Sequence, residues 1–171
     1  MKKHLLSELS EYQLKLCWLF SEYSIDSSQE HYANRGQSDI DKVKSDIYHG
    51  KMAEFMVYNY FTSLEKDVSF PDIAIYKAGD KNFDADLVAG NTKLHVKCHV
   101  ENSNFPISWL FQKNDELVKS RPDGNFLCLV VFSASEYYMY VCDIKNAKFS
   151  EPIKEVLKGN KTCFYLSENM K

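Results

Sequence analysis

Apolar residues recur along the chain first at helical spacing and then at strand spacing. The segments 5–23 and 38–63 carry the helical pattern and are predicted to be helices, with a polar loop over 24–37. Alternation and turn residues predict strands at 72–77, 83–89, 93–100, 125–133, 136–143 and 162–166. A helix is expected from Pro106 to about residue 120, and a short one over 153–157.

This order predicts an α/β protein with a central mixed β-sheet flanked by helices. A chain of 171 residues suits a single domain spanning 1–171. Its core is expected at 38–133, in the order α-β-β-β-α-β. An extra N-terminal helix and loop occupy 1–37, and C-terminal β-β-α-β additions end the chain at 134–171.

Composition excludes several classes of protein. With 44% hydrophobic residues, six Gly and four Pro, the chain is neither disordered nor collagenous. No apolar run is long enough for a membrane span, and no signal peptide is evident. The cysteines are odd in number and form no CxxC pair, which favours reduced, mostly buried thiols over a disulfide framework or a zinc knuckle. They are Cys17, Cys98, Cys128, Cys142 and Cys163.

One carboxylate falls on the apolar stripe of the second predicted helix. Steps of three and four residues connect Ile40, Val43, Ile47, Gly50, Glu54, Val57 and Phe61. Glu54 therefore points toward the core, where an ionised carboxylate needs a cation or a metal. The alternative is a structural Glu that reaches solvent or pairs with a buried Lys.

Polar side chains gather on one face of a predicted hairpin. A two-residue turn at Gly90-Asn91 would pair Ala89 with Thr92. Side chains directly opposite each other share a face. One face then carries Asp84, Asp86, His95, Lys97 and His99, and the other carries Phe83, Ala85, Leu87, Leu94, Val96 and Cys98. A turn of another length would remove this match.

These polar groups suit metal-assisted hydrolysis of a phosphodiester. Carboxylates bind divalent cations through hard oxygen atoms, and a bound cation activates water and neutralises phosphate. A neighbouring Lys can contact the attacking water or stabilise the charge of the transition state. The alternative is an exposed hairpin face with opposite charges, which is common on protein surfaces.

Taken together, the helix, the hairpin and the following helix and strand resemble the PD-(D/E)xK nuclease superfamily, which has the restriction-endonuclease-like fold. The resemblance covers roughly 38–133. The superfamily's helical Glu, strand Asp and (D/E)xK Lys fall by position on Glu54 (in GKMAEF), Asp86 (in DADLV) and Lys97 (in HVK). It implies a divalent-metal-dependent nuclease that uses Mg²⁺ or Mn²⁺, with DNA as the expected substrate of an endonuclease and RNA not excluded.

One residue departs from that motif, because His95 stands where the superfamily has an acidic residue. His95 either ligates the metal with Glu54 and Asp86, or Glu54 or the accessory Asp84 supplies the missing carboxylate. An imidazole is a softer ligand than a carboxylate and would favour Mn²⁺ over Mg²⁺. The departure also keeps an alternative open, a catalytically inactive nuclease-like fold that binds nucleic acid or a protein partner.

Other residues are candidates for contacts to nucleic acid. They are Arg35, Lys93, His99 and Lys113, with Gln112 as an accessory residue of the groove. The net charge of −3 does not argue against such contacts, because six Lys and three acidic residues follow from residue 145 onward. The resemblance implies a cytoplasmic protein of a bacterial or phage-infected cell, and a homodimer would suit double-strand cutting.

Overall fold

The computed structural model describes residues 1–33, 39–76, 85–101 and 104–170, of which 26–33 by their backbone alone. The long helices are α1 (Glu11–Ala33) and α2 (Ile40–Ser63), and α3 (Glu116–Ser120), α4 (Glu155–Lys158) and α5 (Leu166–Asn169) are short. The strands are β1 (Lys3–Leu6), β2 (Leu87–Ala89), β3 (Thr92–Val100), β4 (Ser108–Gln112), β5 (Asn125–Phe132), β6 (Tyr137–Asp143) and β7 (Lys161–Tyr165). A 3₁₀ turn, Ile144–Asn146, follows β6.

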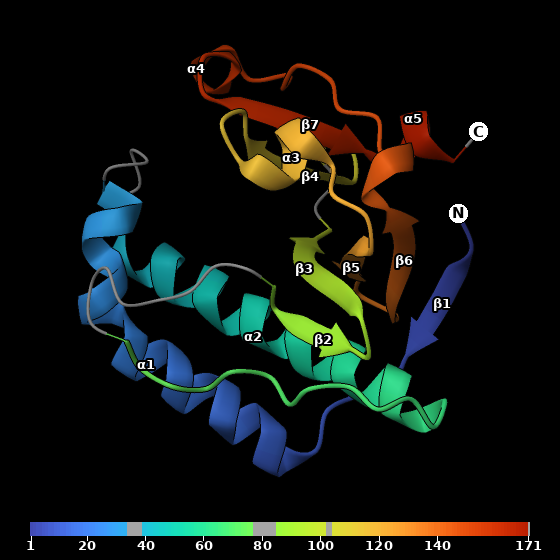
Figure 1. Cartoon of the computed structure of the whole chain (residues 1–171). Coiled ribbons are helices and arrows are strands. Elements are labelled where there is room, and N and C mark those ends of the chain that lie inside the picture. Colours follow the sequence, from blue (N-terminus) through green and yellow to red (C-terminus); the bar gives the residue numbers. More distant parts are fainter. Residues whose placement is uncertain (34–38, 77–84, 102–103, 171) are drawn as a thin grey trace.

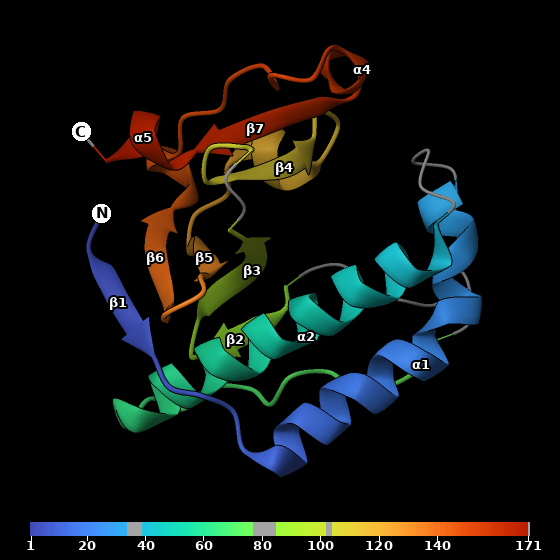
Figure 2. The ribbon, with the colours of Figure 1, turned by 180° about the vertical axis from the view of Figure 1, so that it is seen from behind.

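A mixed five-stranded sheet in the order β1-β6-β5-β3-β2 forms the centre of the protein. Strands β3 and β5 are parallel, and the other neighbours are antiparallel. The N-terminal strand β1 lies beside β6 at one edge, and the β2–β3 hairpin forms the other edge (Figures 1 and 2). The expected α/β class with a mixed central sheet flanked by helices is thus confirmed.

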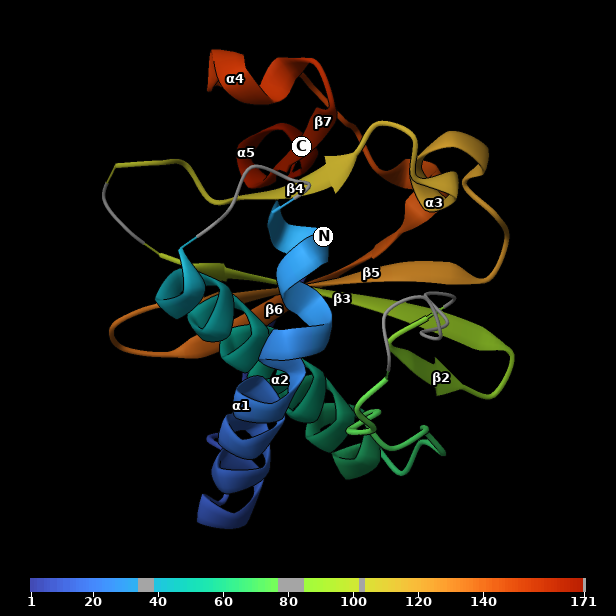
Figure 3. The same ribbon diagram turned by 90° about the vertical axis from the view of Figure 1, so that its left-hand side faces the viewer.

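Different layers cover the two faces of this sheet. In the edge-on view of Figure 3, α1 and α2 lie on one side, and β4 and β7 lie on the other. Leu94 and Val96 of β3 pack with Phe55 and Met56 of α2. On the opposite face, Leu127, Leu129 and Val131 of β5 pack beneath Trp109, Phe111 and Phe164 of the β4–β7 sheet. Each large apolar side chain buried here contributes about 1.5–3 kcal/mol.

The start of the chain differs from its prediction. Helix α1 begins only at Glu11, because Ser10 and Gln13 form a capping box: the Ser10 amide donates to Gln13 Oε1 at 3.2 Å and the Gln13 amide to Ser10 Oγ at 3.3 Å. Of the residues predicted to be helical before it, Leu5 and Leu6 belong to β1, and residues 7–10 form neither helix nor strand. Helix α1 continues to Ala33, so most of the predicted loop over 24–37 is helical.

Helix α2 follows its prediction closely. Asp39 caps it by accepting a hydrogen bond from the Lys42 amide at 3.1 Å, and the helix ends at Ser63 as expected. Its central residues contact both the sheet and α1, so the buried surface is broader than a single stripe. These buried residues are Val43, Lys51, Met52, Ala53, Phe55, Met56 and Val57.

The helix predicted from Pro106 to residue 120 is wrong for most of its length. Trp109 and Phe111 are buried while Leu110 between them is exposed, which is the period of a strand. This segment forms β4 and pairs with β7, and only α3 is helical. Asp115 starts α3 by accepting a hydrogen bond from the Leu117 amide at 3.0 Å.

The predicted strand at 72–77 is also wrong where the structure describes it. Asp72 Oδ1 accepts a hydrogen bond from the Ala74 amide at 2.9 Å, a local turn that competes with strand pairing. An isolated bridge between Val68 and Ala89 occupies the outer side of β2 instead. Of the predicted strand 83–89 only β2 forms, and residues 77–84 lie outside the described part. The first strand of the expected β-β-β unit is therefore reduced to a bridge.

The remaining expectations agree better with the structure. Strands β5, β6 and β7 and the short helix α4 lie within a few residues of their predicted ranges. All five cysteines are unpaired, and four are buried. Within the described ranges, no helix combines the length and the apolar character that a bilayer span requires.

Candidate functional site

The β2–β3 hairpin has the predicted turn and register. Gly90 takes a left-handed conformation with φ of +59°, which a residue with a side chain rarely adopts. Ala89 pairs with Thr92, and Leu87 pairs with Leu94. Because the register is as predicted, the side chains of β3 alternate as expected. Leu94 and Val96 face the helices, and His95 faces the β4–β7 layer.

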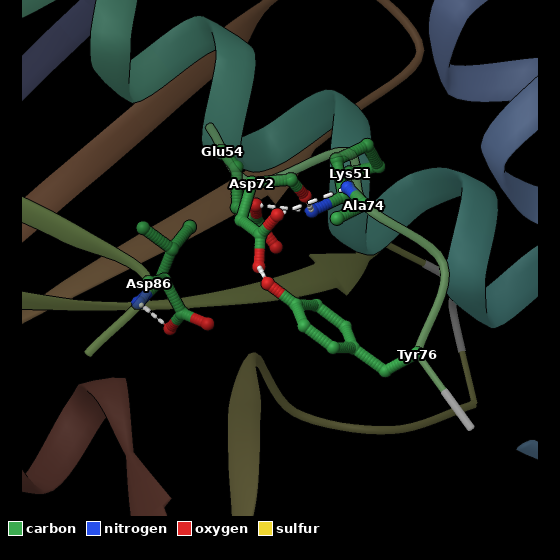
Figure 4. Close-up of polar contacts among 7 residues, drawn as sticks. Lys51, Glu54, Asp72, Ala74, Tyr76 and Asp86 are labelled. Atoms are coloured by element: carbon green, nitrogen blue, oxygen red, sulfur yellow. Dashed lines mark hydrogen bonds and ion pairs between the residues drawn. The ribbon is translucent and has the colours of Figure 1, made fainter. Parts of the chain in front are cut away.

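Asp86 lies directly before β2, and its hydrogen bonds continue the contact of this segment with β3. Its backbone amide donates to the Leu94 carbonyl at 3.2 Å. Its Oδ2 accepts from the Val96 amide at 2.8 Å (Figure 4). The carboxylate thereby satisfies an amide of β3 that a longer β2 would have bonded. The other oxygen, Oδ1, has no hydrogen-bond partner among the described residues.

His95 is held in one tautomer. It is 9% exposed, and its Nε2 lies 2.7 Å from Oδ1 of Asn125, which is 6% exposed. The Asn125 amide group donates to the Asp123 carbonyl at 3.0 Å, so its oxygen must face His95. An amide oxygen only accepts, and Nε2 therefore carries the proton while Nδ1 keeps a lone pair. That is the state in which an imidazole can bind a cation.

Lys97 is the only exposed member of the HVK segment. Its ammonium lies 5.9 Å from the ring centroid of Phe111 in β4. No carboxylate in the described part of the chain pairs with it.

Glu54 belongs to a different environment. Its Oε2 accepts from Nζ of Lys51 at 2.6 Å, and the same Nζ donates to the Asp72 carbonyl at 2.6 Å (Figure 4). Lys51 is 4% exposed, and its ammonium lies 4.3 Å from the Phe20 ring centroid. The pairing with a buried Lys is the structural alternative that the sequence left open for Glu54. Since α2 covers the opposite face of β3 from His95, the helical Glu and this imidazole are not brought together.

The sequence did not single out the partners of Glu54. Asp72 accepts from the Tyr76 hydroxyl through Oδ2 at 2.8 Å, which places a second carboxylate and a phenol beside the Lys51–Glu54 pair (Figure 4). A Lys and a Glu three residues apart on a helix can form an ion pair, so this spacing could have indicated the Lys51–Glu54 pair. Nothing in the sequence linked either residue to Asp72.

The expected nucleic-acid contacts are dispersed. His99 is covered by β4, where its Nδ1 donates to the Ser108 carbonyl at 3.0 Å. Lys113 pairs with Glu151 at 2.8 Å, at the far end of the β4–β7 sheet. Gln112 lies in a strand rather than the expected helix. With its amide oriented to satisfy its neighbours, it accepts from Lys161 Nζ at 2.6 Å and donates to the Asn160 carbonyl at 3.3 Å.

Two further candidates fall outside the described residues, namely Arg35 and Asp84. Lys93 lies at the start of β3, half-buried, and its amide donates to the Gly124 carbonyl at 2.8 Å. Of the sequence-predicted site, Asp86, His95 and Lys97 thus lie on one hairpin, whereas Glu54 lies on α2 and pairs with Lys51.

Burial shifts the pKa values of three cysteines and of His99 toward their neutral forms. It raises the pKa of Cys17 and Cys128 to about 12 and that of Cys98 to about 11. These thiols are protonated and are poor ligands and nucleophiles. Burial also lowers the pKa of His99, which favours its neutral form.

The donor atoms fit a divalent cation only in part. Asp86 and His95 each offer one uncommitted donor atom on the hairpin, whereas Glu54 is paired with Lys51. Among the residues that the structure describes, no three or more His, Cys, Asp or Glu side chains form a group able to hold a metal ion.

Comparisons of the chain with protein-family models, with curated proteins and with solved structures found no significant match.

Proposed function

We propose that this protein is a divalent-metal-dependent nuclease of the PD-(D/E)xK type that hydrolyses DNA as an endonuclease. The observation that carries the proposal is the state of the hairpin. Among the described residues, Asp86 Oδ1, His95 Nδ1 and Lys97 Nζ have no hydrogen-bond or ion-pair partner, and Lys97 Nζ lies 5.9 Å from the Phe111 ring centroid. A carboxylate, a lone-pair imidazole and an ammonium are the groups that phosphodiester hydrolysis uses.

Each residue has a distinct role in this proposal. Asp86 and His95 provide donor atoms for Mg²⁺ or Mn²⁺, which would neutralise the phosphate and activate a water molecule when bound. Lys97 contacts the phosphate oxygens, where negative charge accumulates in the transition state. His95 serves through Nδ1, because its Nε2 proton is held by Asn125. Glu54 would join the donor set only by leaving Lys51.

The proposed setting is the cytoplasm of a bacterial or phage-infected cell, with RNA as a substrate still to be tested. A homodimer would place two sites on the two DNA strands. Helix α1 is the proposed interface, because Tyr12, Trp18 and Tyr23 expose half or more of their surfaces to solvent along it.

Incubation of supercoiled plasmid with Mg²⁺, Mn²⁺ or EDTA tests the proposal. Nicked and linear products are expected with either metal and none with EDTA, and Mn²⁺ should support faster cleavage, because imidazole is the softer ligand. Asp86→Asn is the test variant, since it retains an acceptor for the Val96 amide but loses the negative charge, and it should not support cleavage. Metal-dependent cleavage that Asp86→Asn leaves unchanged would reject the assignment.

A second candidate function is binding of nucleic acid without cleavage. The Lys51–Glu54 pair favours it, because this pair occupies the carboxylate that the superfamily uses as a helical ligand. Gel-shift titrations on the same plasmid fragments separate the two functions. Retarded DNA that stays intact in both metals would establish the binding module.

A further inference from the structure

A cavity of about 310 Å³, open to solvent on one side, lies at the end of the central sheet, and none of residues 86–97 lines it. The parallel strands β3 and β5 both end there, and α2 passes over it. In open α/β sheets, the carboxyl ends of parallel strands are the usual place for ligands. The lining residues are His49, Met52, Val100, Glu101, Phe132, Ser133, Ala134 and Tyr137.

Two polar groups of this cavity, on His49 and Glu101, are hydrogen-bond acceptors. Nδ1 of His49 lies 2.8 Å from the Ser45 carbonyl and must donate to it, so Nε2 presents a lone pair. The Glu101 carboxylate has no ion-pair partner in the described ranges. Ser133 Oγ is engaged internally, because it donates to the Glu136 carbonyl at 2.9 Å. None of the described lining residues is Lys or Arg.

Aromatic rings form the apolar side of the cavity. Phe132 lies with its ring centroid 5.7 Å from that of His49 and 5.5 Å from that of Tyr137. Aromatic faces attract cations, and the attraction grows when the cation is partly removed from water. The lining therefore offers a cation two kinds of partner, the Glu101 carboxylate and the aromatic rings of Phe132 and Tyr137.

We propose that this cavity binds a small organic cation, a guanidinium or primary ammonium group with a short aliphatic body. Glu101 pairs with the cation, His49 Nε2 accepts a second hydrogen bond, and Phe132 and Tyr137 contact the aliphatic body. The volume agrees with a ligand of this size, since pockets for small molecules occupy roughly 300–1,000 Å³. The site is independent of the nuclease proposal and shares no residue with it.

Titration of the full chain with agmatine, followed by amide and imidazole NMR signals, tests this site. Agmatine joins a guanidinium to an ammonium through four methylenes, and n-butylurea is its neutral counterpart. Saturable shifts are expected at Glu101, Ala134 and Tyr137 and in the His49 ring with agmatine alone. Glu101→Gln should weaken binding about tenfold or more, because a charge-assisted hydrogen bond is lost.

Glu8→Gln is the matched control, as it removes the same charge from an exposed acid elsewhere on the chain. This variant should bind agmatine as the wild type does. Equal shifts with n-butylurea, unchanged affinity in Glu101→Gln, or an equal loss in Glu8→Gln would each overturn the proposal. The last result would identify general charge attraction instead of a site.

Discussion

The side-chain amide of Asn125 determines which ring nitrogen of His95 carries the proton. The two side chains are buried and lie 2.7 Å apart, and the Asp123 carbonyl fixes the orientation of the amide. The imidazole therefore presents Nδ1 as its only lone pair. In metal sites, such a second hydrogen bond orients the ligand and sets its tautomer.

Asn125→Ala should release this tautomer. We expect the ¹⁵N signals of His95 to move from those of an Nε2–H imidazole toward a tautomer mixture, and cleavage to fall about 10- to 100-fold. Asn125→Asp retains an acceptor and should keep the Nε2–H signals. Asn146→Ala, at an exposed site, controls for loss of an amide. Unaltered His95 signals in Asn125→Ala would show that the amide does not select the tautomer.

Lys97→Ala should lower cleavage at least ~10²-fold, as loss of a group that stabilises transition-state charge does. Its free energy of unfolding should stay within about 0.5 kcal/mol of the wild type, because the side chain is exposed and has no described ion pair. Plasmid cleavage and urea unfolding measure the two effects. Lys119→Ala, an exposed change in α3, is the control. Wild-type cleavage by Lys97→Ala would exclude a catalytic role for this residue.

Glu54→Ala should destabilise the fold, because it leaves the buried ammonium of Lys51 without its carboxylate. Glu54 retains 16% exposure, so we expect about 3 kcal/mol, the lower end of the range for breaking a buried pair. The double variant Lys51→Met/Glu54→Ala should recover about half of this loss.

Urea unfolding of the four proteins in this cycle measures the coupling between Lys51 and Glu54. The exposed Lys42–Asp46 pair is the comparison, and Lys42→Ala should cost less than about 0.5 kcal/mol. A double variant that folds stably yet cleaves as well as the wild type would remove Glu54 from the catalytic site. Additive losses would show that the pair contributes nothing as a pair.

Stability should fall in mild acid because of His99. Burial lowers the pKa of this imidazole below its ordinary value of 6.5, so the unfolded chain binds the proton more readily than the folded one. Its contribution is complete above about pH 6.5 and is lost as the pH falls through the folded-state pKa. His99→Gln should unfold with a shallower pH dependence between about pH 5 and 7 in urea titrations. Parallel curves for the two proteins would contradict this.

The sequence predicted best the features that depend on neighbouring residues. The hairpin turn follows from Gly90 and Asn91, and alternation about it placed His95 and Lys97 on one face of β3. The segment that forms β4 was predicted to be a helix. A Pro followed by mixed apolar and polar residues suits a helix or a strand, and only the pairing with β7 decides between them. Burial of His95 under the β4–β7 layer could not be anticipated for the same reason.

The partner of Glu54 could not be predicted from neighbouring residues alone. Spacing along α2 placed the carboxylate inside the protein, and two explanations, a metal or a buried Lys, remained open. The Asp72 segment, which forms neither helix nor strand, provides the carbonyl that accepts the second hydrogen bond of the Lys51 ammonium. Contacts between segments without periodicity leave no pattern in the sequence.

The pairing of β1 with β6 has a consequence for the order in which the protein folds. Lys3 pairs with Glu136 across 133 positions of the chain, and the β1 register runs along Tyr137 to Tyr140. By contrast, α1 and α2 are consecutive and pack on each other without a later segment. On a ribosome, the helical pair can associate early, whereas β1 must wait until β6 has left the exit tunnel. Closing so long a loop is slow, so completion of this sheet edge is expected to be the late step of folding.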